Sequence, residues 1–217
     1  MNTKNILSTM LLLTTLAVHA QSSNRIPRGK IYLVTQVQFP TFNNLNDELT
    51  AFGYAPITAS FGSGTGGYGS FHRWIIGGEG NYFSAEQKKN GKTTSLNGGW
   101  GFLFAGYVVT KGKVLVYPSL GVGGGGAAVH LIKNAENNNL GDLLATEGNS
   151  TSISMGSFLV NPAISLEYPI GHQLDIGLKA SYVTSFQEHA WQAEGMSPTV
   201  SDSLGGVTLA FHFGFRL

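Results

Sequence analysis

The sequence predicts an all-β protein: a closed, antiparallel, membrane-spanning barrel of about eight strands, with one short helix in its first loop. Three observations predict this fold. Several long segments alternate between apolar and polar or small residues, which is the period of a strand with one apolar face. Only 12% of the residues are charged and 30 are glycine, an unusual mixture for a soluble domain. Tight turns alternate with longer polar connections, as a meander of membrane-spanning strands requires.

The N-terminal segment has the pattern of an export signal. Lys4 supplies a positive start, an apolar run extends from Met10 to Val18, and Val18 and Ala20 are the small residues of a cleavage site. The apolar run is too short to cross a bilayer as a helix. We therefore expect a signal peptide at 1–20, cleaved after Ala20, and a barrel domain at 21–217.

The last segment alternates most clearly. Its apolar row is Val207, Leu209, Phe211, Phe213, Phe215 and Leu217. This strand resembles the C-terminal strand of small outer-membrane β-barrel proteins of Gram-negative bacteria. The resemblance implies an outer-membrane location among outer-membrane lipids. It also implies that Phe211, Phe213, Phe215 and Leu217 form the signal that the barrel-assembly machinery recognises.

The same alternation predicts the other strands. The expected strands are 29–39, 56–68, 72–83, 93–109, 113–132, 151–168, 172–186 and 204–217. The turns at 110–112 and 169–171 are short and would be periplasmic. The connections at 84–92, 133–150 and 187–203 are longer and polar, so they would be extracellular. A partner could bind to 133–150 and 187–203, and Trp191 could contact it.

We expect the apolar row of each strand to face the lipid. The rows are Leu96, Trp100, Phe102, Phe104 and Val108; Phe158, Val160, Ile164, Leu166 and Tyr168; and Leu174, Ile176, Leu178, Ala180, Tyr182 and Phe186. Aromatic residues near strand ends would form girdles at the two membrane interfaces. They are Trp74, Tyr82, Trp100, Tyr107, Tyr117, Tyr168 and Tyr182.

A short helix is predicted in the first connection, from Asn44 to Gly53. The segment has a capping Asn, acids in its first turn, apolar residues at helical spacing and a terminal glycine. Two placements stay open. The helix could pack on the barrel rim as part of a loop, or it could fold into the barrel mouth as a lid.

Several charged or titratable residues fall on the face opposite the apolar rows. They are Arg73, Glu79, Glu167, Asp175, Lys179, His212 and Arg216. Buried charges are costly unless they are paired, so we predict an ion-paired network in the lumen. Its role would be structural or, alternatively, that of a small-ligand or proton pathway. Eight strands enclose a space only wide enough for side chains, which argues against a diffusion pore.

The remaining motifs predict no cofactor, no metal and no nucleic acid. Two glycine runs, Gly62-x-Gly64-x-x-Gly67 and Gly121-x-Gly123-x-x-Gly126, match a dinucleotide fingerprint in letters, but no helical pattern follows them. The histidines lack metal-ligand spacing, there is no cysteine, and a net charge of +1 without a basic stripe gives no nucleic-acid surface.

Three functions are compatible with these patterns. The first is a non-catalytic outer-membrane barrel with a closed polar lumen and a structural or surface-interaction role. The second is a soluble, secreted barrel that binds an apolar ligand, in which the apolar rows would face inward. The third is a lipid-modifying enzyme of the outer membrane, for which Ser185, Glu188 and His189 would be the candidate catalytic residues. Adjacent residues of a strand point to opposite faces, and we therefore expect no enzyme.

Overall fold

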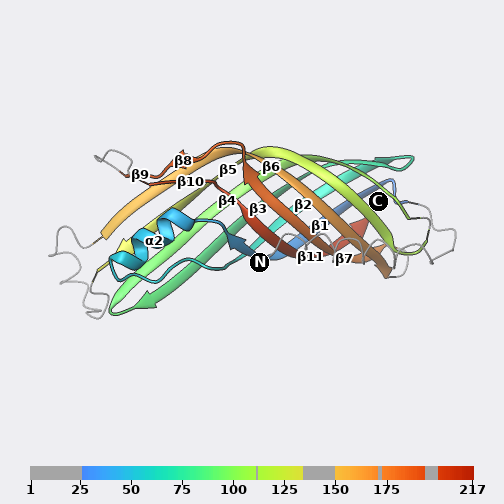
Figure 1. Ribbon diagram of the computed structural model, residues 1–217. Coiled ribbons are helices and arrows are strands. Elements are labelled where there is room, and N and C mark those ends of the chain that lie inside the picture. The colour runs from blue at the N-terminus through green and yellow to red at the C-terminus, as the bar shows by residue number, and fades with distance from the viewer. Residues whose placement is uncertain (1–25, 111, 134–149, 171–172, 194–199) are drawn as a thin grey trace, which may run out of the picture.

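The chain forms one closed, antiparallel β-barrel in the computed structural model, which describes residues 26–110, 112–133, 150–170, 173–193 and 200–217 (Figure 1). Eight strands follow each other around the wall, and the last pairs with the first. They are β1 (Gly29–Pro40), β2 (Ser60–Phe71), β3 (Trp74–Lys89), β4 (Lys92–Tyr107), β5 (Leu115–Ile132), β6 (Ser150–Ile170), β7 (Leu174–Ser185) and β11 (Gly206–Arg216). The predicted fold class is confirmed. The predicted signal peptide, 1–20, lies outside the described residues.

The strand register shows how the barrel closes. We start at Gln36 of β1 and move from each residue to its cross-strand partner on the next strand. This path passes through β2, β3, β4 and β5 and reaches Met155 of β6. In the other direction they lead through β11 and β7 to Ser165 of the same strand. The two paths therefore meet β6 ten residues apart. Such a stagger tilts the strands, as closure of a small barrel requires.

The outer surface of the wall carries many large apolar side chains. Leu103 is 72% exposed, and Leu178 and Phe211 are 59% and 44% exposed. On β6, β7 and β11 the outward rows are the predicted ones. This orientation is the opposite of the one that a soluble, ligand-carrying barrel requires.

The predicted face of β4 was wrong. Leu96, Trp100, Phe102 and Val108 are buried in the barrel interior, while the outward positions include Leu103. Alternation defines two faces but not which of them is inside, and here the bulkier row packs inward. Trp100 and Tyr117 likewise point into the barrel interior and are buried, so they are not girdle residues. The exposed aromatics among those predicted are Trp74, Tyr82, Tyr107, Tyr168 and Tyr182.

The predicted long connection at 84–92 was also wrong. β3 runs to Lys89 and β4 begins at Lys92, so only Asn90 and Gly91 form the turn. Both have positive φ, 53° and 72°, as a two-residue type I′ hairpin turn demands. β2 likewise begins at Ser60 rather than at 56.

The two ends of the barrel differ. We call the end with the short connections β2–β3, β4–β5 and β6–β7 the turn end. The other, the loop end, carries α2 (Asn43–Ala51) and the short strands β8 (His189–Ala190), β9 (Gln192–Ala193) and β10 (Ser201–Asp202) (Figure 1). β8 pairs with β10, and β9 extends the edge of β6.

Within the described residues, no helix has the length and apolar character needed to span a membrane.

The barrel lumen as candidate functional site

The lumen is divided into two halves of different chemistry. The charged half lies toward the turn end. It contains Lys30, Tyr32, Tyr68, Glu79, Tyr117, Glu167, Asp175, Lys179, His212 and Arg216. The apolar half lies toward the loop end, where inward residues of the long strands meet α2 in one buried cluster. The charged residues identified in the sequence therefore account for only one half of the lumen, and the lumen that we expected to be polar throughout is apolar at its loop end.

Lys30 is the centre of the first group of ion pairs. Its Nζ lies 3.1 Å from Glu167 Oε1 and 2.6 Å from Asp175 Oδ1, and all three side chains are fully buried. Arg216 Nε lies 3.3 Å from Asp175 Oδ2. These residues come from β1, β6, β7 and β11, four strands in succession around the wall. The pairs therefore join the strands at which the barrel closes.

Two tyrosines complete the surroundings of Glu167. Tyr68 donates to its Oε2 at 2.9 Å and Tyr117 to its Oε1 at 2.6 Å. β2, which carries Tyr68, lies on the opposite side of the barrel from β6, so this bond crosses the lumen. A buried carboxylate keeps its charge at low cost only when both oxygens are satisfied. Glu167 meets that condition.

A second ion pair also crosses the lumen. Lys179 Nζ on β7 lies 2.8 Å from Glu79 Oε1 on β3, and three strands separate β3 from β7 in either direction. Tyr32 donates to Glu79 Oε2 at 2.9 Å, and Asn81 donates to Oε1 at 2.9 Å. The ring of His212 stacks on Tyr32 with centroids 4.8 Å apart. Side chains thus fill the cross-section at this level.

The predicted lumen residues are placed as follows. Glu79, Glu167, Asp175, Lys179 and His212 are buried, and Arg216 is partly buried. Arg73 lies apart from them, half-buried in the turn between β2 and β3, and forms no ion pair with the described residues. Sequence reasoning missed Lys30. The sequence did contain a sign of its inward orientation, because Lys30 lies on the strand face opposite the apolar residues Ile31 and Leu33.

Glycines make room for the bulky lumen side chains. A Cβ at Gly66 would lie 2.6 Å from the Tyr32 ring, and a Cβ at Gly214 would overlap Lys30. The two glycine runs noted in the sequence lie inside β2 and β5 and open no helix. Their inward members serve close packing, and neither run has the strand–helix setting of a dinucleotide site.

The apolar half is closed by α2. Leu45 and Leu49 of the helix are buried in the cluster that contains Phe83, Trp100 and Leu159 of the barrel wall. The helix therefore folds into the mouth as a lid, the second of the two placements considered. Burial of such side chains contributes about 1.5–3 kcal/mol each, so α2 is a firmly packed part of the fold.

The N-terminus of α2 is held by a residue far away in the sequence. The N-cap is Phe42, which offers no side-chain hydrogen bond, and no acid lies in the first turn, so this part of the helix prediction was wrong. Instead Asp202 of β10 accepts bonds from the backbone N–H groups of Asn44 and Leu45, both at 3.0 Å. Its Oδ2 also accepts from Trp191 Nε1 at 3.1 Å. A carboxylate at this position accepts hydrogen bonds from N–H groups that have no partner within the helix, and its negative charge interacts favourably with the positive end of the helix dipole.

The C-terminus of α2 is fixed locally. Gly53 has φ 76°, and Tyr54 N donates to Leu49 O at 2.8 Å, which is a Schellman ending. Asn46 exchanges two hydrogen bonds with the backbone of Ile57, at 2.7 and 3.0 Å. Burial raises the pKa of the Tyr54 phenol. The segment after the helix is therefore fixed to α2 and forms part of the structure that closes the barrel mouth.

A belt of uncharged polar residues separates the two halves. Gln38 on β1 pairs across with Thr208 on β11, and Gln36 is the next inward residue of β1. Five residues of this belt each have a buried side-chain polar atom with no hydrogen-bond partner in the described part of the chain: Gln36, Gln38, Asn81, Asn161 and Thr208. Buried groups of this kind are normally satisfied by ordered water.

The candidate catalytic residues do not form a catalytic arrangement. Ser185 Oγ donates to Gln187 O at 2.7 Å and lies 3.0 Å from Ser203 Oγ. No hydrogen bond joins it to Glu188 or His189 among the described residues. A serine nucleophile needs such a base. Nor does any group of three or more His, Asp or Glu side chains in the described ranges approach closely enough to hold a metal ion.

No protein-family model and no curated protein matches this sequence. Solved structures do match it in fold. Ail, the attachment invasion locus protein of Yersinia pestis, is 13% identical with a TM-score of 0.52, over 88% of this chain and all of that one (100%). OprG of Pseudomonas aeruginosa is 10% identical with a TM-score of 0.53, over 90% of this chain and 98% of that one.

Neisserial surface protein A is also similar, with 8% identity and a TM-score of 0.51, over 87% of this chain and 97% of that one. At these identities the likeness concerns the fold. The chain has the fold of small, eight-stranded outer-membrane barrels, as its C-terminal strand suggested. The match agrees with the outer-membrane location predicted from the sequence.

Proposed function

We propose that this protein is a closed outer-membrane barrel without a catalytic role, which serves envelope structure and presents its loop end outside the cell. One observation carries the proposal. The Lys179–Glu79 pair crosses the lumen, and the lid α2 closes the mouth above it. A barrel filled in this way offers no open path for solutes, and its outward apolar rows suit a bilayer.

Cell fractionation tests the membrane location. We expect the protein in the outer-membrane fraction, surrounded by outer-membrane lipids, and a gel band that shifts when the sample is boiled, because the barrel resists detergent until heated. A soluble periplasmic protein without a heat shift would contradict the location.

Planar-bilayer recording tests the closed lumen. The purified, refolded protein should produce no unitary currents, because charged and apolar side chains block successive levels of the lumen. A general porin inserted in the same bilayer is the positive control. Steady single-channel currents from this protein would contradict the closed barrel and favour a pathway through it.

Assembly into the membrane would use β11. Phe211, Phe213 and Phe215 point outward from this strand, as does Leu217 beyond it, which leaves their side chains available to the barrel-assembly machinery. We expect Phe213→Ser with Phe215→Ser to reduce the amount of heat-shifted barrel in cells. Refolding of the same variant into detergent in vitro separates an assembly defect from a loss of stability.

We further propose that the loop end binds an anionic partner. Ail has been crystallised with sucrose octasulfate, a heparin analogue. In this chain Lys88, Lys89 and Lys133 are exposed at the loop end, where the β3–β4 hairpin lies beside the end of β5. The connections 133–150 and 187–203, which would share this surface, lie partly outside the described residues.

A heparin column tests this binding. The wild type should be retained and elute with salt, because the contact is electrostatic. Lys89→Ser with Lys133→Ser should elute earlier. Lys113→Ser is the matched control, since Lys113 is exposed at the turn end and its loss should change nothing. Equal elution of all three proteins would refute the role of the loop-end lysines.

A further inference from the structure

The turn end of the barrel carries positive charge that nothing in the described chain neutralises. The ion pairs around Lys30 balance one another, because they join two cations to two carboxylates. Three further cations lie at this end, and none of them forms an ion pair with the described residues: Arg28, Arg73 and Lys113. Arg28 and Lys113 are exposed, and Arg73 is half-buried. We call these three residues the turn-end cations.

The surrounding sequence contains no acid that could offset this charge. Asp and Glu are absent from the segment before β1 and from the three connections at the turn end: 21–28, 71–74, 108–114 and 169–173. The loop end differs, since Asp47, Glu86 and Glu188 are exposed there together with several lysines. Positive charge of a single sign is therefore a property of the turn end only, and it is complementary to an anion.

Turn chemistry does not explain why basic residues occupy the β2–β3 connection. β2 ends at Phe71 and β3 begins at Trp74, so His72 and Arg73 form the whole turn. Two-residue hairpin turns favour Asn-Gly or a glycine, as Asn90 and the glycine after it show at the loop end. His72 instead has φ 56°, a conformation that favours glycine. The two side chains are thus present although the turn would form more easily without them.

The turn-end cations lie where the apolar outer surface ends. Trp74 and Tyr107 are exposed girdle residues whose rings meet edge to face, with centroids 5.2 Å apart. Arg73 directly precedes Trp74, a step of ~3.4 Å along a strand. On each side of a bilayer the headgroup layer is about 5–7 Å thick. The Arg73 side chain therefore lies within the headgroup layer rather than in the solution beyond it.

Arg28 occupies the corresponding position on β1. The next residue, Gly29, accepts a backbone hydrogen bond from Leu217 at 2.9 Å, and the Leu217 side chain is 74% exposed. Ser70 of β2 donates its N–H to Arg28 O at 2.9 Å and pairs on its other side with Ile75 of β3. Arg28 and the chain around Arg73 are thus two strand spacings apart, ~10 Å, which two long arginine side chains can span to reach one phosphate group.

We propose that the turn end binds the headgroups of anionic phospholipids through Arg28, Arg73 and Lys113. The proposal rests on the proposed membrane location, in which the turn end would face the periplasm. Guanidinium groups form paired, charge-assisted hydrogen bonds with phosphate oxygens. The charge of the lipid headgroup supplies the counter-charge that this end of the chain lacks.

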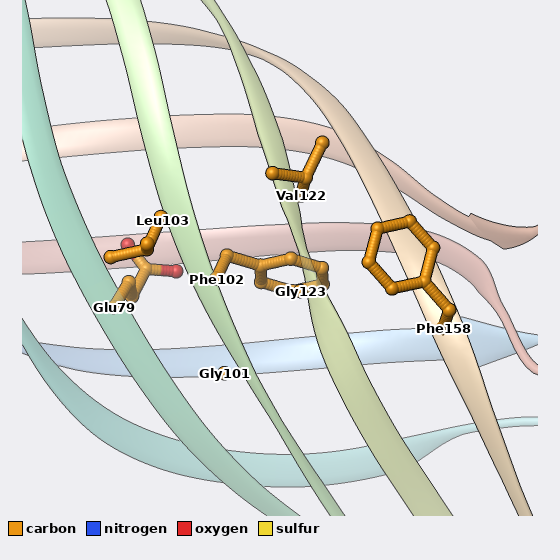
Figure 2. A pocket seen from close by; sticks show the side chains of 7 residues that line it. All are labelled: Glu79, Gly101, Phe102, Leu103, Val122, Gly123 and Phe158. Atoms are coloured by element: carbon orange, nitrogen blue, oxygen red, sulfur yellow. The ribbon is translucent and has the colours of Figure 1, made fainter.

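The outer surface next to the cations favours a lipid over a soluble anion. The exposed Trp74 and Tyr107 rings offer contacts to the glycerol and the first part of the acyl chains. Farther along the wall the exposed side chains are apolar, among them Leu103, Val122 and Phe158 (Figure 2). A soluble anion would use the cations alone and would gain nothing from these neighbours.

Native mass spectrometry of the full, detergent-solubilised protein tests the proposal. The probes are phosphatidylglycerol and phosphatidylcholine with the same two C16 chains, offered as an equal mixture, so that they differ in net charge and not in their chains. Glycerophosphoglycerol, which has the anionic headgroup without the chains, is offered separately.

Two triple variants compare the ends of the barrel. The turn-end variant is Arg28→Gln, Arg73→Gln and Lys113→Gln. The loop-end variant removes the same number of charges from exposed positions at the other end and is the matched control: Lys88→Gln, Lys89→Gln and Lys133→Gln. Each protein must first show the heat-shifted band, since its absence from the wild type would refute the membrane barrel itself.

We expect the wild type and the loop-end variant to retain phosphatidylglycerol in preference to phosphatidylcholine. The turn-end variant should lose this preference, by about fivefold for each cation removed. Equal retention of both lipids by the folded wild type would overturn the proposal, and so would an unchanged preference in the turn-end variant. If glycerophosphoglycerol binds as well as the lipid, the turn end is a site for soluble anions and the assignment to phospholipid is wrong.

Discussion

The two halves of the lumen close the same barrel by different means. In the charged half, directional bonds join side chains from strands all around the wall, and each buried charge has an opposite charge within 3.3 Å. In the apolar half, non-directional packing against the lid α2 excludes water. A buried charge without its partner is strongly unfavourable, whereas an apolar cluster tolerates imperfect fit better. The charged half should therefore fix the strand arrangement, and the apolar half should hold the lid.

The largest effect should come from Lys30→Met. The change leaves Glu167 and Asp175 buried without their shared cation, which should cost about 3–5 kcal/mol of unfolding free energy. Urea unfolding of the refolded barrel, followed by fluorescence and by the gel shift, measures it. Lys88→Met is the control, because the Lys88–Glu86 pair is exposed and should contribute little. Equal losses for both variants would contradict the central role of Lys30.

A smaller and more local effect should come from Leu49→Ala in the apolar half. Removal of this buried anchor of α2 should cost about 2–4 kcal/mol, mainly by releasing the lid. Limited proteolysis should then cut near 41–59 while the gel shift persists. Thr50→Ala, an exposed neighbour on the same helix, should leave the cleavage pattern unchanged. Loss of the gel shift in Leu49→Ala would mean that the two halves unfold as one unit.

The latch between α2 and β10 should give a still smaller effect. Asp202→Asn keeps the size of the side chain but removes the charge that faces the helix N-terminus, which should cost about 1–2 kcal/mol. Faster proteolysis of the lid segment is the measurement. Asp47→Asn, exposed on the same helix, provides the control. If both variants resist protease as the wild type does, the latch does not hold the lid.

The smallest effect should come from a double variant that measures how much the Lys179–Glu79 ion pair contributes to the free energy of unfolding. Lys179→Met together with Glu79→Gln removes both charges of the pair that crosses the lumen, and an acceptor remains for Tyr32. The double variant should lose less than about 1 kcal/mol, because replacing both partners avoids an isolated buried charge. Lys179→Met alone should lose more. If the double variant is the less stable of the two in urea, the ion pair itself stabilises the barrel.

Much of the wall could be predicted from the sequence. Alternation along β7 and β11 identified Leu178 and Phe211 as outward residues because each strand has one clearly apolar row. In β4 both rows are apolar or small, so alternation did not determine which row faces the lipid, and Trp100 was placed on the wrong side. The local Asn90-Gly91 turn was visible in the sequence, but the length of the hairpin was not.

The sequence by itself determined the class of fold, the strand order and most of the residues that face outward, because these depend on local periodicity and on turn chemistry. Only the tertiary structure decided which side chains meet inside. Tyr68 reaches Glu167 and Lys179 reaches Glu79 across the lumen, and Asp202 caps a helix 157 positions away in the chain. Such contacts depend on how the barrel closes, which is set by the register of all eight strands together.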